Sequence, residues 1–335
     1  MAKAETWLHP RSAGLYCAAG DFYIDPHLPV ERAVITHGHS DHARAGHSCV
    51  LATPETLAIM KVRLGADHAG ATQALTYGEA IRIGDVDVKL APAGHVLGSA
   101  QVVMDNGGCR VVVSGDYKRT PDPTCAPFEV QRCDVFVTEA TFGLPVFRHE
   151  PPANEIKRLL NSMERLPERT HLVGAYGLGK CQRLLTLVRQ QGYERAIYLH
   201  GAMQSVTDVY RQFGFDFGEL RPATNASAEQ LAGALVFCPP FAVADRWSRR
   251  FGDPVRAVAS GWMRIRARAR QRGADLPLII SDHADWPELL QTIEEIAAEE
   301  IWVTHGREDA LIHHVGTLGK RGRALSLIGF EDEAD

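Results

Sequence analysis

Four side chains that can bind a metal ion fall within six consecutive positions near the start of the chain. They are His37, His39, Asp41 and His42. The apolar run 33–36 directly precedes them and reads as a buried strand. Imidazole and carboxylate groups are the ligands that hold Zn²⁺ and similar ions. Because His37 and His39 alternate along an extended segment, they point the same way. We expect one cation at this pair and a second at the Asp41–His42 pair.

Three more candidate ligands border short β-like runs elsewhere in the chain. His95 lies in the glycine-containing segment 93–99, and Asp116 and His305 each follow an apolar run. A carboxylate has two oxygens, so Asp116 can bridge two cations. Each residue alone would more often be structural, and the alternative for the whole set is a loop of surface residues that bind no metal. The shared strand-then-ligand arrangement favours a two-metal hydrolase.

The composition is that of a globular protein with one large domain or two modest ones. The chain has 335 residues, of which 45% are apolar and 23% charged. The first ten residues contain no apolar signal segment, and no apolar run has the length of a membrane span. The seven cysteines include no Cys-x-x-Cys pair, which excludes a zinc ribbon or a disulfide framework. We therefore expect a cytoplasmic protein without membrane partners.

The pattern of apolar residues changes along the chain. The first third is rich in short β-like runs, and the middle alternates strands with helices, which is typical of a parallel α/β unit. The predicted strands include 86–90, 101–104, 110–114, 134–138, 171–175, 196–199, 276–281 and 301–304. The predicted helices are 154–165, 180–191, 203–213 and 286–299.

Positive charge is concentrated in one segment, although the net charge is −5. Nine arginines and the single acid Asp253 lie between positions 246 and 272. If this segment is helical, Arg264, Arg268 and Arg272 share one face. We expect these three to contact phosphates, with a solvated helix face as the alternative.

The segment 177–180, Gly-Leu-Gly-Lys, lacks the spacing and the Ser/Thr of a nucleotide phosphate loop. It begins a predicted helix, whose free N–H groups and Lys180 could hold a terminal phosphate. Tyr176 could stack a base, and a plain packing role is the alternative.

Several longer motifs resemble those of a known family. They are His37-x-His39-x-Asp41-His42, Ala93-Gly94-His95-Val96-Leu97-Gly98, Ser114-Gly115-Asp116, Thr138-Glu139-Ala140-Thr141-Phe142-Gly143, Ser281-Asp282-His283-Ala284-Asp285 and Thr304-His305-Gly306. The set resembles the metallo-β-lactamase superfamily and, within it, the β-CASP nucleases. The greatest similarity is to the bacterial DNA ligase-associated exonuclease group. This resemblance implies an αββα sandwich with an inserted, reduced β-CASP-like cap. The sandwich would comprise residues 1–149 and 274–335, and the cap 150–273.

The resemblance also implies a role for each residue. His37, His39 and His95 would hold one metal ion. Asp41, His42 and His305 would hold the other, with Asp116 shared between them. Asp25 would orient a ligand side chain.

A proton donor follows from the same comparison. His283 corresponds to the family's candidate general acid, and Glu139 would support it. An imidazole can carry a proton near neutral pH, which suits this task. The alternatives for His283 are a further metal ligand or a residue at a helix N-terminus without chemistry. Asp41, Glu139 and His283 are the expected catalytic side chains.

Together these patterns predict a metal-dependent phosphodiesterase. The expected reaction is exonucleolytic digestion of single-stranded DNA, 5′ to 3′, in DNA repair. The expected cofactors are two divalent ions, Zn²⁺ first with Mn²⁺ as the alternative, and a DNA ligase and a helicase are the implied partners. An RNA-processing nuclease of the same fold, a small-molecule (thio)ester hydrolase and a non-catalytic nucleic-acid-binding module are the other hypotheses.

Overall fold

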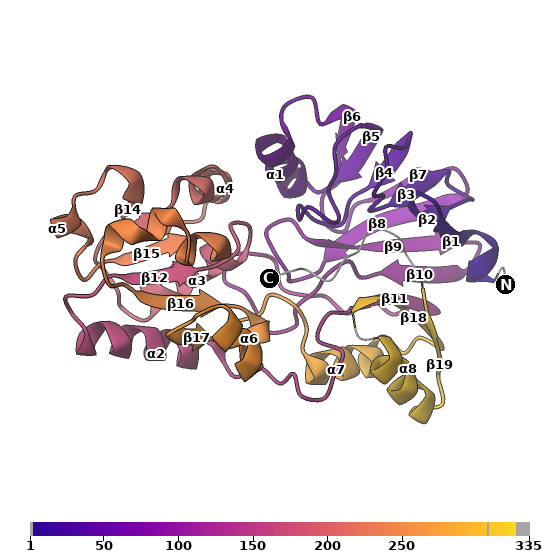
Figure 1. The fold of residues 1–335 in the computed structure, drawn as a ribbon. Coiled ribbons are helices and arrows are strands. Elements are labelled where there is room, and N and C mark those ends of the chain that lie inside the picture. The colour runs from indigo at the N-terminus through magenta and orange to yellow at the C-terminus, as the bar shows by residue number, and fades with distance from the viewer. Residues whose placement is uncertain (1–2, 307, 326–335) are drawn as a thin grey trace. The chain divides into compact units, whose positions relative to one another are not determined.

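The chain folds into two units in a computed structural model that describes residues 3–306 and 308–325 (Figure 1). Of the described residues, unit 1 contains those up to Arg148 and those from His283 to Leu325. Unit 2 contains His149–Asp282. The sequence analysis placed the insertion at 150–273, whereas the structural units divide after residues 148 and 282.

Unit 1 contains two mixed β-sheets. The first has the strand order β1-β2-β3-β4-β5-β6, and its pairs are parallel from β3 onward. Its strands are β1 (Leu8–Arg11), β2 (Gly14–Cys17), β3 (Phe22–Ile24), β4 (Arg32–Val34), β5 (His47–Ala52) and β6 (Ala69–Ala74). The short helix η1 (Ala4–Thr6) precedes β1, and α1 (Pro54–Leu64) follows β5.

The second sheet of unit 1 is built from both ends of the chain. Its order is β19-β18-β11-β10-β9-β8-β7, in which β10, β11, β18 and β19 run parallel. Its strands are β7 (Ala80–Ile83), β8 (Val86–Pro92), β9 (Ala100–Asn106), β10 (Cys109–Val113), β11 (Val135–Ala140), β18 (Glu300–Gly306) and β19 (Arg321–Ala324). Helices α7 (Trp286–Ile296) and α8 (Glu308–Thr317) belong to the same unit.

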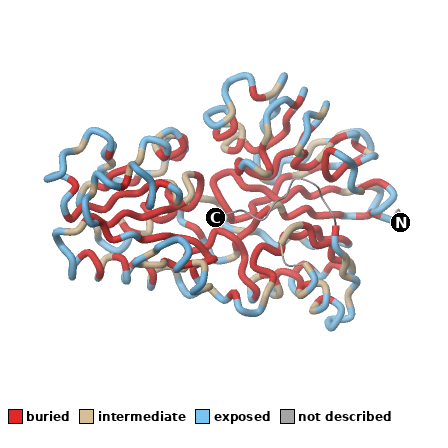
Figure 2. Tube along the Cα trace, viewed as in Figure 1, coloured by how far each residue is buried: buried red, intermediate tan, exposed pale blue. Residues whose placement is uncertain are grey.

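The faces of these sheets explain the layers of unit 1. Side chains along a strand alternate between faces, so Val111 and Val113 join a core shared with the first sheet, whereas Val112 packs against α7 and α8. Helix α1 covers the outer face of the first sheet through Met60. Figure 2 shows the buried trace along these strands. Unit 1 is therefore a mixed α/β structure of two sheets between helices.

Unit 2 contains one fully parallel sheet of order β14-β13-β15-β12-β16-β17. Its strands are β12 (His171–Gly174), β13 (Ile197–Leu199), β14 (Leu220–Pro222), β15 (Leu235–Cys238), β16 (Val255–Ala259) and β17 (Leu276–Leu278). Its helices are α2 (Pro152–Arg165), α3 (Lys180–Gln190), α4 (Gly201–Gln212), η2 (Ala223–Asn225), α5 (Ala228–Leu231), η3 (Pro240–Val243), η4 (Arg246–Phe251), η5 (Gly261–Arg264) and α6 (Arg266–Gln271). The predicted parallel α/β unit is present.

Some predicted elements differ from the structure; strand β17, for example, ends at Leu278, whereas the predicted strand continued to 281. Helix α7 ends at Ile296 rather than 299, because Ala297 adopts a left-handed φ of 61°. The arginine segment does not form one helix, because Ile265 is extended between η5 and α6. The condition under which Arg264, Arg268 and Arg272 would share one helical face is therefore not met. Within the described ranges, no helix combines the length and apolar character needed to cross a membrane.

Candidate metal centre

Loops at neighbouring strand ends of unit 1 bring the candidate ligands together. The loop after β4 carries His37–His42, and the loop between β8 and β9 carries His95. Asp116 follows β10, and His305 lies near the end of β18. Because β10, β11 and β18 are parallel neighbours, their carboxyl ends meet at one edge of the sheet. Residues that are far apart in sequence are therefore close in space.

The first group of ligand atoms consists of His37, His39, His95 and Asp116, all buried. His39 Nδ1 lies 3.2 Å from His37 Nε2 and 3.0 Å from His95 Nε2. Asp116 Oδ2 lies 3.4 Å from His37 Nε2 and 3.8 Å from His95 Nε2. Four donor atoms thus face one small volume.

The second group shares Asp116 and adds His42 and His305. His305 Nε2 lies 3.1 Å from Asp116 Oδ1, and His42 Nε2 lies 3.3 Å from Asp116 Oδ2. Asp41 does not belong to either group, although its Oδ2 is 3.5 Å from His42 Nε2. The carboxylate of Asp116 therefore stands between two sets of histidines, each on one side of it.

In His37, His42 and His305, the ring nitrogen Nδ1 contacts a carboxylate or hydroxyl group. Asp25 Oδ2 lies 2.8 Å from His42 Nδ1 and also accepts the hydroxyl of Thr36 at 2.5 Å. Thr36 Oγ1 lies 3.1 Å from His37 Nδ1, and Thr304 Oγ1 lies 2.9 Å from His305 Nδ1. Such contacts fix the ring orientation and are typical of histidines that ligate metal through the other nitrogen.

Glu139 and His283 form a third group with Asp116. Glu139 lies within β11, at an irregularity in its pairing with β18, rather than beyond the strand as the sequence suggested. Its Oε1 accepts the backbone N–H of Tyr117 at 2.8 Å, and its Oε2 lies 3.0 Å from His283 Nδ1. His283 Nδ1 is 3.9 Å from Asp116 Oδ2. The Glu139–His283 pair therefore borders the two ligand groups.

Burial and neighbouring charges shift the pKa values of the residues in this cluster in opposite directions. Burial lowers the pKa of His37 well below its ordinary value. Burial acts the same way on His42, but the negative charges of Asp116, Asp41 and Asp25 prevail and raise its pKa well above the ordinary value. Burial would raise the pKa of Asp116, yet positive charge at His42 and His283 holds it well below its usual range.

The donor set fits divalent cations. Asp116 Oδ2 is buried and has no hydrogen-bond partner among the described residues. Ligand atoms that are 2.0–2.1 Å from a tetrahedral ion stand about 3.3 Å apart. The distances between donor atoms in the two groups, 3.0–3.8 Å, cover this value. The cluster therefore suggests divalent metal binding.

Sequence reasoning overlooked Thr36 and Thr304. Each is buried and directly precedes a candidate ligand, so the repeated Thr-His pair was a usable signal. It also missed the backbone N–H of Tyr117, whose contact with Glu139 depends on the pairing of distant strands and has no sequence signature.

The nucleic-acid candidates of the sequence analysis lie in unit 2. Lys180 is 4% exposed, with Nζ 3.7 Å from Asp282 Oδ2 and 5.4 Å from the centre of the Tyr176 ring. The guanidinium of Arg268 stacks over Trp262 at 3.8 Å, whereas Arg264 and Arg272 are exposed. Their contact with phosphate stays a prediction.

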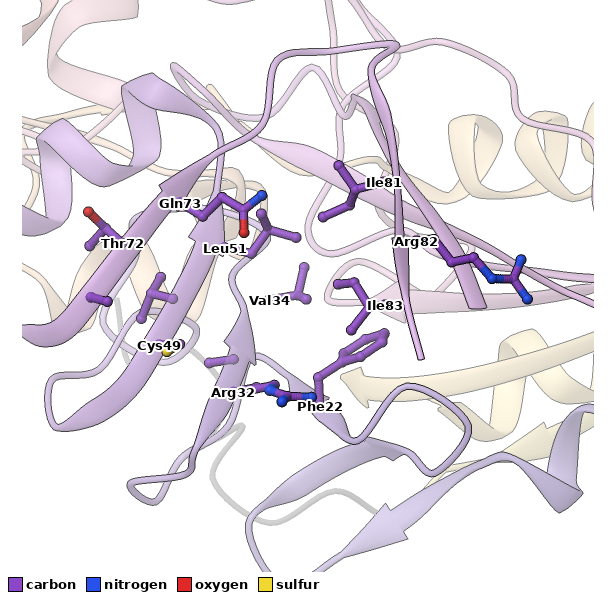
Figure 3. Close-up of a pocket in the computed structure, with 13 residues that line it drawn as sticks. Phe22, Arg32, Val34, Cys49, Leu51, Thr72, Gln73, Ile81, Arg82 and Ile83 are labelled. Carbon is purple, nitrogen blue, oxygen red and sulfur yellow. The ribbon is translucent and has the colours of Figure 1, made fainter. Parts of the chain in front are cut away.

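A cavity of about 490 Å³ lies at the open edge of unit 1, beside β6 and β7 (Figure 3). Its lining is mostly apolar and includes Phe22, Val34, Leu51, Ile81 and Ile83. None of the candidate ligands lines it. The cavity is therefore separate from the histidine cluster.

No family model matches the chain, but individual proteins do. A "Probable DNA ligase" of Opitutus terrae is 29% identical over 97% of this chain and 31% of its own length. "Endoribonuclease YSH1" of Gibberella zeae is 30% identical over 54% of this chain and 26% of its own length. An "Uncharacterized protein in lig 3'region" of Acidianus ambivalens is 31% identical over 42% of this chain and 98% of its own length.

A solved structure shares the fold alone. A protein of unknown function from Enterococcus faecalis V583 superposes with a TM-score of 0.56 at 13% identity, over 81% of this chain and 74% of that one. The chain spans about a third or less of the ligase and endoribonuclease relatives.

Two groups of candidate ligands share one buried carboxylate at the strand ends of a two-sheet α/β unit, and such a set of imidazole and carboxylate donors suits divalent metal ions. The relatives specify the family. The chain belongs to the metallo-β-lactamase superfamily, among its β-CASP nucleases, and is related to the DNA ligase-associated proteins.

Proposed function

We propose that the protein is a metal-dependent nuclease that hydrolyses phosphodiester bonds of nucleic acid. The observation that supports this most directly is the position of Asp116, whose two oxygens each face a different set of histidines. His37, His39 and His95 would hold one cation with Asp116. His42 and His305 would hold the other, with Asp41 beside His42.

The chain's own residues suggest how the reaction proceeds. When bound, two cations supply an activated water and stabilise charge on the phosphate. Asp25 keeps the His42 ring in place, and Thr36 does so for His37. Glu139 contacts Nδ1 of His283 and orients the ring. Nε2 of the same ring would then donate a proton to the leaving oxygen. The assignments of His283 and Glu139 as acid and support thus form part of the proposal.

The finer proposal concerns substrate and partners. We propose DNA, degraded as a single strand from the 5′ end during repair, with Zn²⁺ or Mn²⁺ as the cation. The similarity to a probable DNA ligase, matched over 97% of this chain, supports action at DNA ends next to a ligase. A helicase partner rests on the family resemblance alone.

RNA is the second candidate substrate, because the Gibberella zeae relative is an endoribonuclease. One experiment tests both substrates. End-labelled single- and double-stranded DNA and RNA of one sequence, with 5′-phosphate or 5′-hydroxyl ends, are digested in a panel of divalent ions. A ladder that shortens from the 5′ end of single-stranded DNA supports the proposal. Cleavage of RNA alone supports the second candidate, and hydrolysis of a thioester without any nucleic-acid cleavage rejects both.

A further inference from the structure

Unit 2 presents an aromatic side chain to solvent in an unusual setting. Phe241 is 68% exposed, more than any other large hydrophobic residue in the described part of the chain. It lies in η3, whose next two residues, Ala242 and Val243, are buried, and Val243 packs where a side chain at Gly174 would otherwise stand. Phe241 is therefore exposed although the next two residues of the same turn are packed into the core.

A second aromatic side chain lies on the adjoining element. Trp247 in η4 is half-buried and packs edge-on against His200 at 4.6 Å and against Phe251 at 4.9 Å. Elements η3 and η4 pack together against the same core cluster. Phe241 and Trp247 therefore belong to one surface of unit 2.

The charge of this surface is positive on balance, because three arginines of η4 stand beside the one acid Asp245. Arg250 also donates to the carbonyl oxygen of Thr224 at 3.0 Å. Arg246, Arg249 and Arg250 of η4 are exposed. Of the nine arginines between 246 and 272, none forms an ion pair with a carboxylate among residues 3–306 and 308–325. The acid in the segment, Asp253, pairs with Arg169 from outside it. Asp245 caps η4 by accepting the backbone N–H of Arg246.

We propose that Phe241, Arg246, Trp247, Arg249 and Arg250 form a binding surface for single-stranded nucleic acid. Exposed rings can stack on bases only where the bases are unpaired, and guanidinium groups bind the phosphates between them. A second copy of the chain is a poor occupant, since the same positive surface would repel itself. A purely apolar partner leaves the arginines without counter-charge. The inference deepens the proposed nuclease function by selecting single strands over duplexes.

Binding can be measured separately from cleavage. Fluorescence anisotropy with phosphorothioate-linked oligothymidylate, oligouridylate and a mixed-sequence duplex gives the dissociation constant over a range of salt. Phe241→Ala should weaken single-strand binding about tenfold, the middle of the range for one stacked base, and should leave duplex binding unchanged. Phe241→Trp should restore it. Phe213→Ala is the matched control, because Phe213 is exposed in the same unit but lies at the end of α4.

The arginines are tested through the salt dependence. Arg246→Gln with Arg249→Gln should lower the slope of log affinity against log salt by about 0.7 for each phosphate that the protein no longer neutralises. The control pair is Arg211→Gln with Arg221→Gln, two arginines that already face Asp208 and Glu219. An unchanged slope overturns the role of the η4 arginines.

The outcomes separate this surface from the proposed reaction. Hydrolysis of bis(p-nitrophenyl) phosphate reports the metal centre, and Phe241→Ala should keep the parent rate. If the parent cleaves no phosphodiester but Phe241→Ala still loses single-strand affinity, the surface stands and the nuclease proposal fails. If Phe241→Ala binds single strands as the parent does, or if duplex binds equally tightly, the surface is rejected whatever the enzyme cleaves.

Discussion

Asp116 is the residue on which the candidate metal centre depends. It is 1% exposed, and its two oxygens contact histidines from the loop after β4 and from β18. A buried carboxylate is costly unless positive charge surrounds it. Its neighbours His42, His283 and His305 partly supply that charge, and a pair of cations would supply more.

The first prediction concerns metal content. Asp116→Ala should lose both cations, because each ligand group contains its carboxylate, whereas His305→Ala should lose mainly one. Metal analysis by plasma mass spectrometry measures the stoichiometry, and Asp105→Ala in the β9–β10 hairpin is the control. Two tightly held ions in Asp116→Ala would exclude the shared carboxylate.

The second prediction concerns His283. His283→Ala should keep the metal stoichiometry of the parent and lower turnover about 10²- to 10⁴-fold, the usual effect of removing a general acid. Glu139→Gln should act in the same direction, because Glu139 holds the ring of His283. If His283→Ala loses metal together with activity, the residue is a ligand, in line with its place in the group with Asp116 and Glu139.

The third prediction concerns a buried ion pair near the site. Lys118 Nζ lies 2.6 Å from Glu288 Oε2, with side chains 5% and 12% exposed. Burial would raise the pKa of Glu288, but Lys118 and the hydroxyl and N–H of Thr120 lower it below its ordinary value. A lowered pKa stabilises the fold above the unfolded value and loses that effect as the pH falls through the folded one.

Glu288→Gln should therefore destabilise the protein at pH 7 by about 3 kcal/mol, since it leaves the ammonium of Lys118 buried without its carboxylate. The difference from the parent should shrink as the pH falls below about 4.5, where the carboxyl of the unfolded parent begins to take up a proton while the folded one is still charged. Urea unfolding at several pH values measures it. Glu294→Gln, on the exposed side of α7, is the control. A difference that is constant from pH 7 to acid would contradict the assigned pairing.

At the scale of elements, the site depends on two loops whose backbones lie so close together that no side chain fits between them at position 94. Gly94 has a φ of 76°, and a Cβ there would stand 2.9 Å from the N of Phe128 and overlap the carbonyl oxygen of Lys118. The hydroxyl of Ser99 accepts the backbone N–H of His95 at 3.1 Å. Glycine at position 94 therefore allows the His95 loop to lie against the segment after Asp116.

The fourth prediction compares two glycines of left-handed conformation. Gly94→Ala should lower the free energy of unfolding by more than 2 kcal/mol, roughly the sum of strain and overlap, and should weaken metal binding. Gly107→Ala in the β9–β10 hairpin has a φ of 60° but no neighbour within 4 Å, so it should cost about 1 kcal/mol and leave the metal unaffected. Equal effects of the two substitutions would show that backbone strain, and not crowding at the site, is decisive.

At the scale of the whole molecule, unit 1 contains every candidate metal ligand, whereas unit 2 contains the unpaired arginines and exposed aromatics. If both proposals hold, hydrolysis and recognition of the nucleic-acid strand belong to different units. Metal binding should report on unit 1, and the salt dependence of binding should report on unit 2.

The fifth prediction follows from that division. Removing the cations with a chelator should lower the melting temperature of the protein by roughly 5–10 °C, the effect of losing a ligand present at about a hundred times its dissociation constant. Scanning calorimetry with and without added Zn²⁺ or Mn²⁺ measures the shift. Affinity for single strands at the surface in unit 2 should not follow it. A melting temperature unaffected by chelator, with metal demonstrably removed, would contradict a cluster that cations stabilise.

The candidate ligands could be predicted from the sequence because ligand chemistry is written in residue type and short spacing. The His37–His42 motif requires no knowledge of the fold, and continuous apolar runs predicted the strands that precede Asp116 and His305. The parallel unit in the middle of the chain was likewise readable from its alternating elements. The sequence left open whether the arginine segment is helical, because the extended residue Ile265 between η5 and α6 follows from packing around η5 and β17 and not from local propensity.

The sequence by itself determined which donors exist and that they could suit two cations. Only the tertiary structure decided that they meet around Asp116, that Asp25 and Thr36 hold the histidine rings, and that Asp41 stands outside the two groups. It alone showed which arginines lack carboxylate partners. These features depend on contacts between residues up to 189 positions apart, whereas spacing along a chain carries information only over a few turns.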